Sequence, residues 1–168
     1  SGGAHVTDAS NASRTLLLPL ADASWDAGLC EMLGVPLAAL PEVTDNAGRF
    51  AVTTADLFGG AIPIAGLVGD QQSATIGQGC LKPGETKATY GTGAFVLANM
   101  GGEVPRSGHR LLGTVLCQLG GQRTYALEGS VFVVSFPMSQ ERRSGLLPPT
   151  VGVDNIGGLE YSQPYYWD

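Results

Sequence analysis

The sequence has little charge, and most of that charge is negative. Charged residues make up 14% of the 168 residues, and nine lysines and arginines stand against fifteen aspartates and glutamates, for a formal net charge of −6. A surface of this kind repels the phosphates of nucleic acid, and the adjacent Arg142 and Arg143 are too few to offset the repulsion. We therefore expect no nucleic-acid partner.

The chain also lacks long hydrophobic runs. No apolar stretch approaches the roughly 20 residues that a membrane-spanning helix needs. The first ten residues, SGGAHVTDAS, have neither the basic start nor the apolar stretch of a signal peptide. We expect a cytoplasmic protein with no membrane partner.

Cysteine and histidine are scarce. Cys30, Cys80 and Cys117 are far apart, and His5 and His109 are isolated, so no metal-ligand spacing is present. We expect reduced, partly buried thiols and no metal-binding residue. The 43% hydrophobic content is that of a globular chain, long enough for one domain with a real core or two incomplete ones.

A helix is expected over residues 24–34, SWDAGLCEMLG. Ser24 is a candidate N-cap, and Gly34 followed by Pro36 would end the helix. Apolar residues at helical spacing would form its buried face. They are Trp25, Leu29, Met32 and Leu33.

Most of the remaining elements are expected to be strands. The apolar run at 61–68 predicts a buried strand, followed by a short helix that ends near Gly77 or Gly79. Strands are expected over TKATY and AFVLANM, and two more on either side of Gly120-Gly121. After Phe136 no period is visible.

Asp70 is the first candidate functional residue, because it follows the predicted buried strand. In open α/β sheets, ligands bind beyond the carboxyl ends of the strands, which favours a catalytic carboxylate. An N-cap of the following helix is the alternative. Gln71 and Gln72 place amide groups beside it.

The Gly-Thr-Gly turn at 91–93 is the second candidate. Glycines let backbone N–H groups approach an anion closely, and the Thr92 hydroxyl adds a donor. An ordinary hairpin turn explains the same residues. The turn lacks the third glycine of a dinucleotide fingerprint, because Val96 stands there, and it is not a P-loop.

In combination and in this order, these stretches resemble the glycerol kinases of the FGGY carbohydrate kinase family. The similarity is carried by IPIAGLVGDQQSATIGQGCLKPGETKATYGTGAFVLANMG at 62–101. HVTDASNASRTLL before it and YALEGSVF after it extend the similarity from about His5 to Val133. GDQQ together with YGTGxF points to glycerol kinases rather than pentulose kinases.

The resemblance implies an α/β chain with the actin-like ATPase (ribonuclease H-like) fold, and ATP- and Mg²⁺-dependent phosphorylation of glycerol. Asp70 would match the catalytic base, which also binds substrate, and Gln71 a glycerol-binding residue. Phe95 would pack against the carbon backbone of glycerol, and Gly91 and Thr92 would hold the phosphates of ATP.

The resemblance further implies an incomplete fold, spanning the end of the first lobe and the start of the second. Residues 1–77 would belong to the glycerol-binding lobe and 78–168 to the ATP-binding lobe, atypical after 135. Ser135 replaces an expected glycine, and Pro137 stands where a helix should run. We expect the isolated chain to be marginally stable, to self-associate into homo-oligomers and to be inactive.

Two other functions remain open from the sequence. The chain could be a non-catalytic, truncated homologue that only binds a ligand or a partner. It could also belong to a kinase for another small polyol.

Overall fold

The computed structural model describes residues 3–22, 24–90 and 93–131. Up to residue 77 these residues form both helices and short strands, and the elements after residue 77 are all strands; the described residues contain three sheets. The helical elements are α1 (Ala9–Ala12), α2 (Ala27–Met32), the 3₁₀ turn η1 (Leu37–Ala39), α3 (Ala55–Phe58) and α4 (Asp70–Gly77). The strands are β1 (Val6–Asp8), β2 (Glu42–Thr44), β3 (Ala47–Val52), β4 (Pro63–Gly66), β5 (Thr86–Tyr90), β6 (Ala94–Gly101), β7 (Leu112–Leu119) and β8 (Gln122–Val131).

The largest sheet has the strand order β5-β6-β8-β7, and all its neighbours are antiparallel. Gly120 and Gly121 both have positive φ, +57° and +74°, so they form the tight turn between β7 and β8 as predicted. The predicted strands on either side of the Gly-Thr-Gly turn are confirmed as β5 and β6. Gly91 and Thr92 themselves lie outside the described residues.

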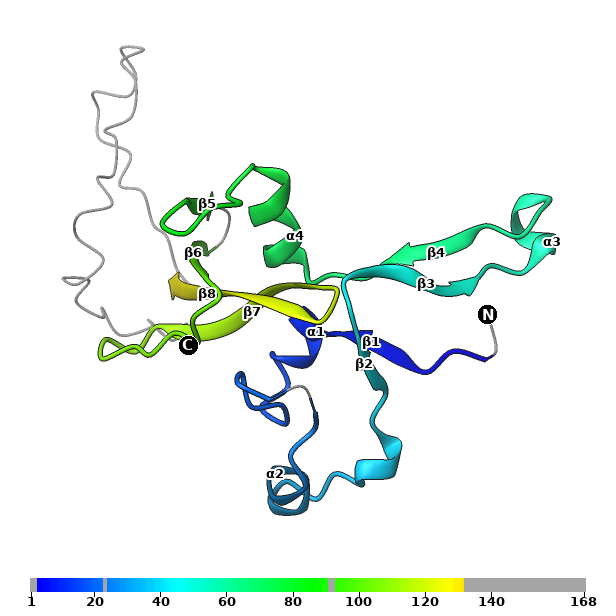
Figure 1. The fold of residues 1–168 in the computed structure, drawn as a ribbon, viewed down its shortest axis with the longest axis horizontal. Coiled ribbons are helices and arrows are strands. Elements are labelled where there is room, and N and C mark those ends of the chain that lie inside the picture. The colour runs from blue at the N-terminus through cyan, green and yellow to red at the C-terminus, as the bar shows by residue number, and fades with distance from the viewer. Residues whose placement is uncertain (1–2, 23, 91–92, 132–168) are drawn as a thin grey trace, which may run out of the picture.

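The two smaller sheets are two-stranded. β1 pairs with β2 in parallel, and β3 pairs with β4 antiparallel. Figure 1 shows the β3–β4 ribbon reaching away from the large sheet, with α3 at its tip. The prediction of a buried strand over 61–68 is therefore wrong: β4 is shorter, and only Ile64 within it is even half-buried.

The core is small and lies around β7 and β8. On one side Ala9 of α1 packs with Val115 and Tyr125, and Leu20 and Val43 pack against this cluster. A second buried cluster joins three strands of the large sheet and consists of Leu97, Leu116 and Ala126. α1 therefore packs on β7, which places the N-terminal segment against the large sheet.

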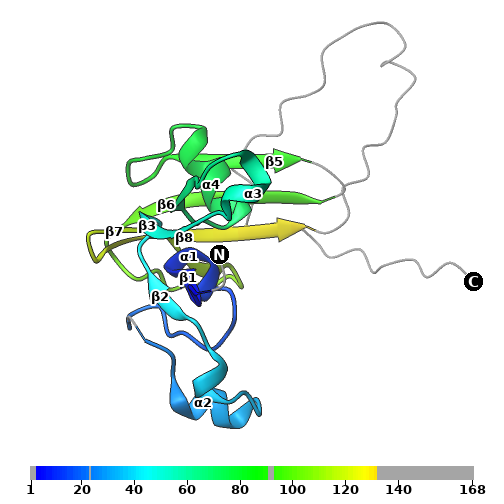
Figure 2. The same cartoon turned by 90° about the vertical axis from the view of Figure 1, so that its right-hand side faces the viewer.

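Helix α2 differs from the sequence prediction in its cap and its face. Asp26, not Ser24, is the N-cap, and its Oδ1 accepts a hydrogen bond from the Leu29 N–H at 2.8 Å. The predicted apolar face is not buried, since Met32 is 78% exposed. The helix buries Cys30 instead. Figure 2 shows α2 lying away from the large sheet, so the sheet does not cover the predicted face.

The helix over 70–77 agrees with the predicted short helix that ends near Gly77. None of the helices in the described ranges is long and apolar enough to cross a membrane.

A set of hydrogen bonds joins the β2–β3 connection to the β7–β8 hairpin. The Asp45 carboxylate accepts from Gln118 Nε2 at 2.9 Å and from the Gly121 N–H at 3.2 Å. Asn46 and Gln118 exchange two more bonds, Asn46 N–H to the Gln118 carbonyl and Gln118 N–H to Asn46 Oδ1. The hydrogen bond from Gln118 is the main cause that lowers the pKa of Asp45. Backbone hydrogen bonds from Gly121 and Gly120 lower it further, and desolvation acts in the opposite direction.

Asp45 should therefore stabilise the fold in a pH-dependent way. A carboxyl group whose pKa is lowered by folding contributes stability above its unfolded pKa of about 3.9, and loses it as pH falls through the folded pKa. We expect Asp45→Asn to lower the free energy of unfolding at pH 6, with the difference from the unsubstituted chain shrinking below pH 4. Urea unfolding at both pH values measures this. The exposed Asp22→Asn is the control, and a difference that does not change with pH would contradict the prediction.

Large apolar side chains are exposed at the tip of the β3–β4 ribbon. Leu57 is 70% exposed and Phe58 is 64% exposed. Exposed apolar surface of this kind favours association. We expect the chain to self-associate, and Leu57→Glu with Phe58→Glu to shift it toward monomer in sedimentation velocity.

The matched control for that variant is Thr54→Glu with Ala55→Glu, which adds the same charge at exposed positions of the same tip without removing a large apolar side chain. If both double variants dissociate the chain equally, charge repulsion and not apolar contact explains the effect.

Candidate active site

Asp70 is the first residue of α4, and its carboxylate is exposed. The interpretation of Asp70 as the N-cap is wrong, because Gly69 occupies that position and no side chain caps the helix. The Asp70 Oδ1 accepts the N–H of the next residue, Gln71, at 2.8 Å. The carboxylate is therefore available to a ligand at the start of the helix.

The turn that carries Asp70 is held by buried polar groups from distant parts of the chain. The Gly69 N–H donates to Ser10 Oγ at 2.9 Å, and Asn46 Nδ2 donates to the Leu67 carbonyl at 2.9 Å. A Cβ at Gly69 would lie 2.4 Å from Oε1 of Gln72, so a larger residue there would displace the buried Gln72 side chain. The position of Asp70 is thus fixed from outside its own helix.

Asp8 is the centre of this network. Its side chain is 1% exposed, and its Oδ1 accepts from the Ser10 N–H at 2.8 Å, the Asn11 N–H at 3.1 Å and Asn46 Nδ2 at 2.8 Å. The Ser10 hydroxyl and Asn11 Nδ2 also donate to its carboxylate. Asp8 therefore caps α1 and orients both side chains, Ser10 and Asn46, that hold the Asp70 turn.

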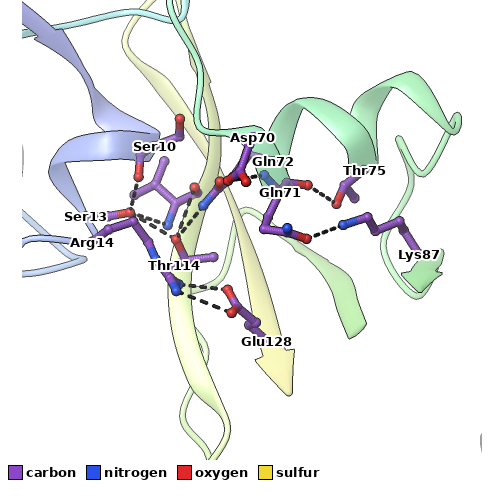
Figure 3. Close-up of polar contacts among 11 residues, drawn as sticks. Ser10, Ser13, Arg14, Asp70, Gln71, Gln72, Thr75, Lys87, Thr114 and Glu128 are labelled. Carbon is purple, nitrogen blue, oxygen red and sulfur yellow. Dashed lines mark hydrogen bonds and ion pairs between the residues drawn. The ribbon is translucent and has the colours of Figure 1, made fainter. Parts of the chain in front are cut away.

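A second set of bonds attaches α4 to the large sheet. Gln72 is 2% exposed, and its Nε2 donates to Thr114 Oγ1 at 3.0 Å. Thr114 Oγ1 also lies 3.0 Å from Ser13 Oγ, which accepts the Val115 N–H at 3.1 Å. Figure 3 shows this chain of contacts running from α4 through β7 to α1.

Gln71 points to the other side, toward β5. Its Oε1 accepts a hydrogen bond from Lys87 Nζ, and its carbonyl accepts from Thr75 Oγ1 at 2.8 Å (Figure 3). Lys87 is 1% exposed. Burial lowers the pKa of Lys87, while the negative charges of Asp70 and Glu128 act in the opposite direction.

An ion pair borders the same region. Arg14 Nη1 lies 2.8 Å from Glu128 Oε2, and Arg14 Nη2 donates to Oε1 at 3.3 Å. Glu128 is 5% exposed, so the pair is mostly shielded from water on its acidic side. The pair joins the segment after α1 to the middle of β8.

Phe95 lies half-buried on β6, opposite Thr89 of β5. Lys87 is paired with Leu97 in the same hairpin. Since side chains alternate between faces along a strand, Phe95 lies on the same face as Leu97 and Lys87, the face that α4 contacts. The structure thus brings three of the predicted site residues to one face, Asp70, Gln71 and Phe95. Gly91 and Thr92 lie outside the described residues.

Sequence reasoning missed the residues that hold this site. Asp8 and Lys87 are the main ones, together with Ser10, Asn46 and Thr114. Asp8 carried a usable signal, because an aspartate before Ala-Ser-Asn is a favoured N-cap. Lys87 carried none, because a lysine in a five-residue strand is normally a solvated position.

Over most of its length the chain is similar to members of the FGGY family of carbohydrate kinases. Residues 2–77 match the model of the N-terminal domain of that family. Its relatives include the glycerol kinases of Cereibacter sphaeroides (strain ATCC 17025) and Sinorhizobium fredii, 54% and 55% identical over 145 residues. These matches cover 86% of this chain but 29% of each relative.

Solved structures confirm the actin-like ATPase fold of these kinases. A crystal structure of Plasmodium falciparum glycerol kinase with ADP superposes with a TM-score of 0.72 at 40% identity, covering 77% of this chain and 26% of that one. The xylulose kinase of Rhodospirillum rubrum superposes at 0.64 with 23% identity, covering 76% and 26%, and shares the fold.

Removing the charge of Asp8 should destabilise the fold. Asp8→Asn keeps the size but turns one acceptor oxygen into a donor that faces other donors. We expect a loss of about 2–3 kcal/mol in the free energy of unfolding, as for a buried hydrogen-bonded charge. Urea denaturation measures it, with Asp22→Asn as the exposed control. A loss no larger than that of the control would show that the Asp8 network contributes little.

Proposed function

We propose that this chain supplies part of the active site of an ATP-dependent glycerol kinase. The observation that carries the proposal is an exposed carboxylate, Asp70, at the start of a helix whose preceding turn is held by a buried polar network. Glycerol kinase relatives at 54% identity support the substrate. Because this chain spans 29% of the length of these relatives, we propose the activity for the whole kinase and not for this chain alone.

In this proposal Asp70 is the base. Its carboxylate accepts the proton of a terminal glycerol hydroxyl as that oxygen forms a bond to the γ-phosphorus of ATP. The bond from that phosphorus to the bridging oxygen breaks, and ADP leaves. Such transfers depend mostly on positioning and charge stabilisation, which is what a rigidly held carboxylate supplies.

Gln71 and Phe95 bind the glycerol in this scheme. The Gln71 amide hydrogen-bonds a hydroxyl, and the ring of Phe95 packs against the carbon backbone. The common face that the strand register gives Phe95 and Lys87, on which α4 lies, supports a shared pocket.

Gly91 and Thr92 are proposed to hold the phosphates of ATP, and the ADP-bound relative supports nucleotide binding. Mg²⁺ would neutralise phosphate charge, but the described residues contain no group of three or more His, Cys, Asp or Glu that could hold a metal. No step is assigned to the ion.

We also propose a division of the chain at residue 77, with 1–77 on the glycerol side and 78–168 on the ATP side. The family-model match, which ends at 77, supports it. The connection after α4 is short and is held by hydrogen bonds at Cys80. The Cys80 N–H donates to the Thr75 carbonyl, and Asn99 Nδ2 donates to the Cys80 carbonyl. We propose the cytoplasm as the compartment, where ATP is present and the thiols stay reduced.

One alternative has an observation in its favour. The exposed apolar residues at the ribbon tip, Leu57 and Phe58, favour a module that only associates with a partner or another copy. The isolated 168-residue chain is expected to be inactive in either case, so glycerol 3-phosphate formation with Mg-ATP is assayed in the chimaera described next. Turnover would exclude the non-catalytic alternative, and a panel of small polyols would define the substrate.

The site is tested independently in a chimaera. In it, this chain's aligned segment replaces the corresponding 145 residues of the full-length Cereibacter sphaeroides glycerol kinase. Glycerol phosphorylation by the chimaera supports the proposed function, and its absence in a folded chimaera that binds ATP would overturn it.

Within the chimaera, Asp70→Asn should abolish most of the activity. The amide cannot accept the proton, so we expect kcat to fall about 10²–10⁴-fold. Thermal stability should change by less than about 0.5 kcal/mol, because the side chain is exposed. Asp56→Asn, an exposed acid in the first turn of α3, is the control. Retained activity would show that Asp70 is not the base.

A further inference from the structure

Lys87 is a charged side chain in a place suited to an apolar one. It is 1% exposed, and its partner across the hairpin is the fully buried Leu97. Burying an ammonium group is costly unless hydrogen bonds and opposite charges compensate. The hydrogen bond of Lys87 Nζ goes to Oε1 of Gln71, a residue of the proposed glycerol site.

That bond decides which end of the Gln71 amide faces the sheet. A lysine ammonium only donates, whereas an amide has one accepting end and one donating end. A flipped amide would place Nε2 donors against the donors of Lys87. The contact therefore holds Oε1 toward Lys87 and leaves both N–H groups of Nε2 for another partner.

The backbone of Gln71 is fixed as well. Its N–H donates to Asp70 Oδ1 at 2.8 Å, and its carbonyl accepts from Thr75 Oγ1 at 2.8 Å. With the backbone bonded at both ends and the side chain bonded at Oε1, the amide has a defined orientation next to Asp70. Such preorganisation reduces the entropy lost when a ligand binds.

We propose that Lys87 is a positioning residue that presents the Gln71 amide as a hydrogen-bond donor to a hydroxyl oxygen of the substrate. The proposal rests on the proposed function, because it needs Gln71 in the glycerol site. It adds that the substrate oxygen next to Gln71 accepts a hydrogen bond from the Gln71 amide. Lys87 itself touches Gln71 and not the substrate.

The first test is Lys87→Met in the chimaera. Methionine keeps an unbranched chain of similar length and removes the donor, so the amide can turn. We expect KM for glycerol to rise about tenfold, the worth of roughly one hydrogen bond. The KM for ATP should stay within twofold, and kcat should fall far less than in Asp70→Asn. Lys82→Met, the same change at an exposed lysine, is the control and should alter neither KM.

A double-mutant cycle separates positioning from a general effect on folding. If Lys87 acts through Gln71, Lys87→Met should add almost nothing to glycerol KM once Gln71→Ala is present. Additive effects of the two substitutions would overturn the proposal. An equal rise in the KM for ATP would do the same, because it would indicate a structural role.

Gln71→Glu tests the direction of the hydrogen bond without removing Lys87. The carboxylate still accepts from Lys87 Nζ but has no donor for the substrate. We expect about the same rise in glycerol KM as for Gln71→Ala, with no loss of thermal stability. Normal glycerol binding by Gln71→Glu would overturn the proposal, and this test holds even where Lys87→Met fails to fold.

The unsubstituted chimaera distinguishes a failure of the proposed function from a failure of the positioning role. If the unsubstituted chimaera folds, binds ATP and does not phosphorylate glycerol, the proposed function is wrong and the role of Lys87 falls with it. If that chimaera is active and Lys87→Met leaves glycerol KM unchanged, only the positioning role is wrong.

Discussion

The buried carboxylate of Asp8 is the constraint on which the described structure depends. A charge that is 1% exposed has to be surrounded by donors, and the chain supplies them from α1 and from Asn46, thirty-eight residues away. Satisfying Asp8 brings Ser10 and Asn46 to the turn before α4 and brings Asn46 to Gln118 of β7. One buried charge thus connects the two small sheets to the large one.

Helix α4 transmits this order to the proposed site. It has only eight residues, too few to be stable alone, and its inward contacts are largely polar. Gln72 bonds to Thr114 on one side and Gln71 bonds to Lys87 on the other, so the helix spans β7 and β5. Its exposed first residue, Asp70, is consequently held with little freedom although it makes no cap.

Local sequence patterns predicted the elements better than their surroundings. The glycines of the β7–β8 turn and the strand-forming residues of β5 and β6 depend on nearest neighbours, and both features were predicted correctly. The buried strand at 61–68 and the buried face of α2 were wrong, because burial depends on what packs against a segment. Nothing in the described residues covers Leu57 or Met32, and an apolar pattern alone does not reveal that.

The sequence by itself determined the family resemblance and the candidate residues Asp70, Gln71 and Phe95. Motifs such as GDQQ and YGTGAF are short, contiguous stretches, so they can be recognised without the structure. Only the tertiary structure decided that Asp70 is not a cap, that Asp8 holds its turn and that Lys87 faces Gln71. These contacts join residues 16 to 59 positions apart. Long-range hydrogen bonds of this kind leave no periodic trace in the sequence, since their geometry exists only once the strands have paired.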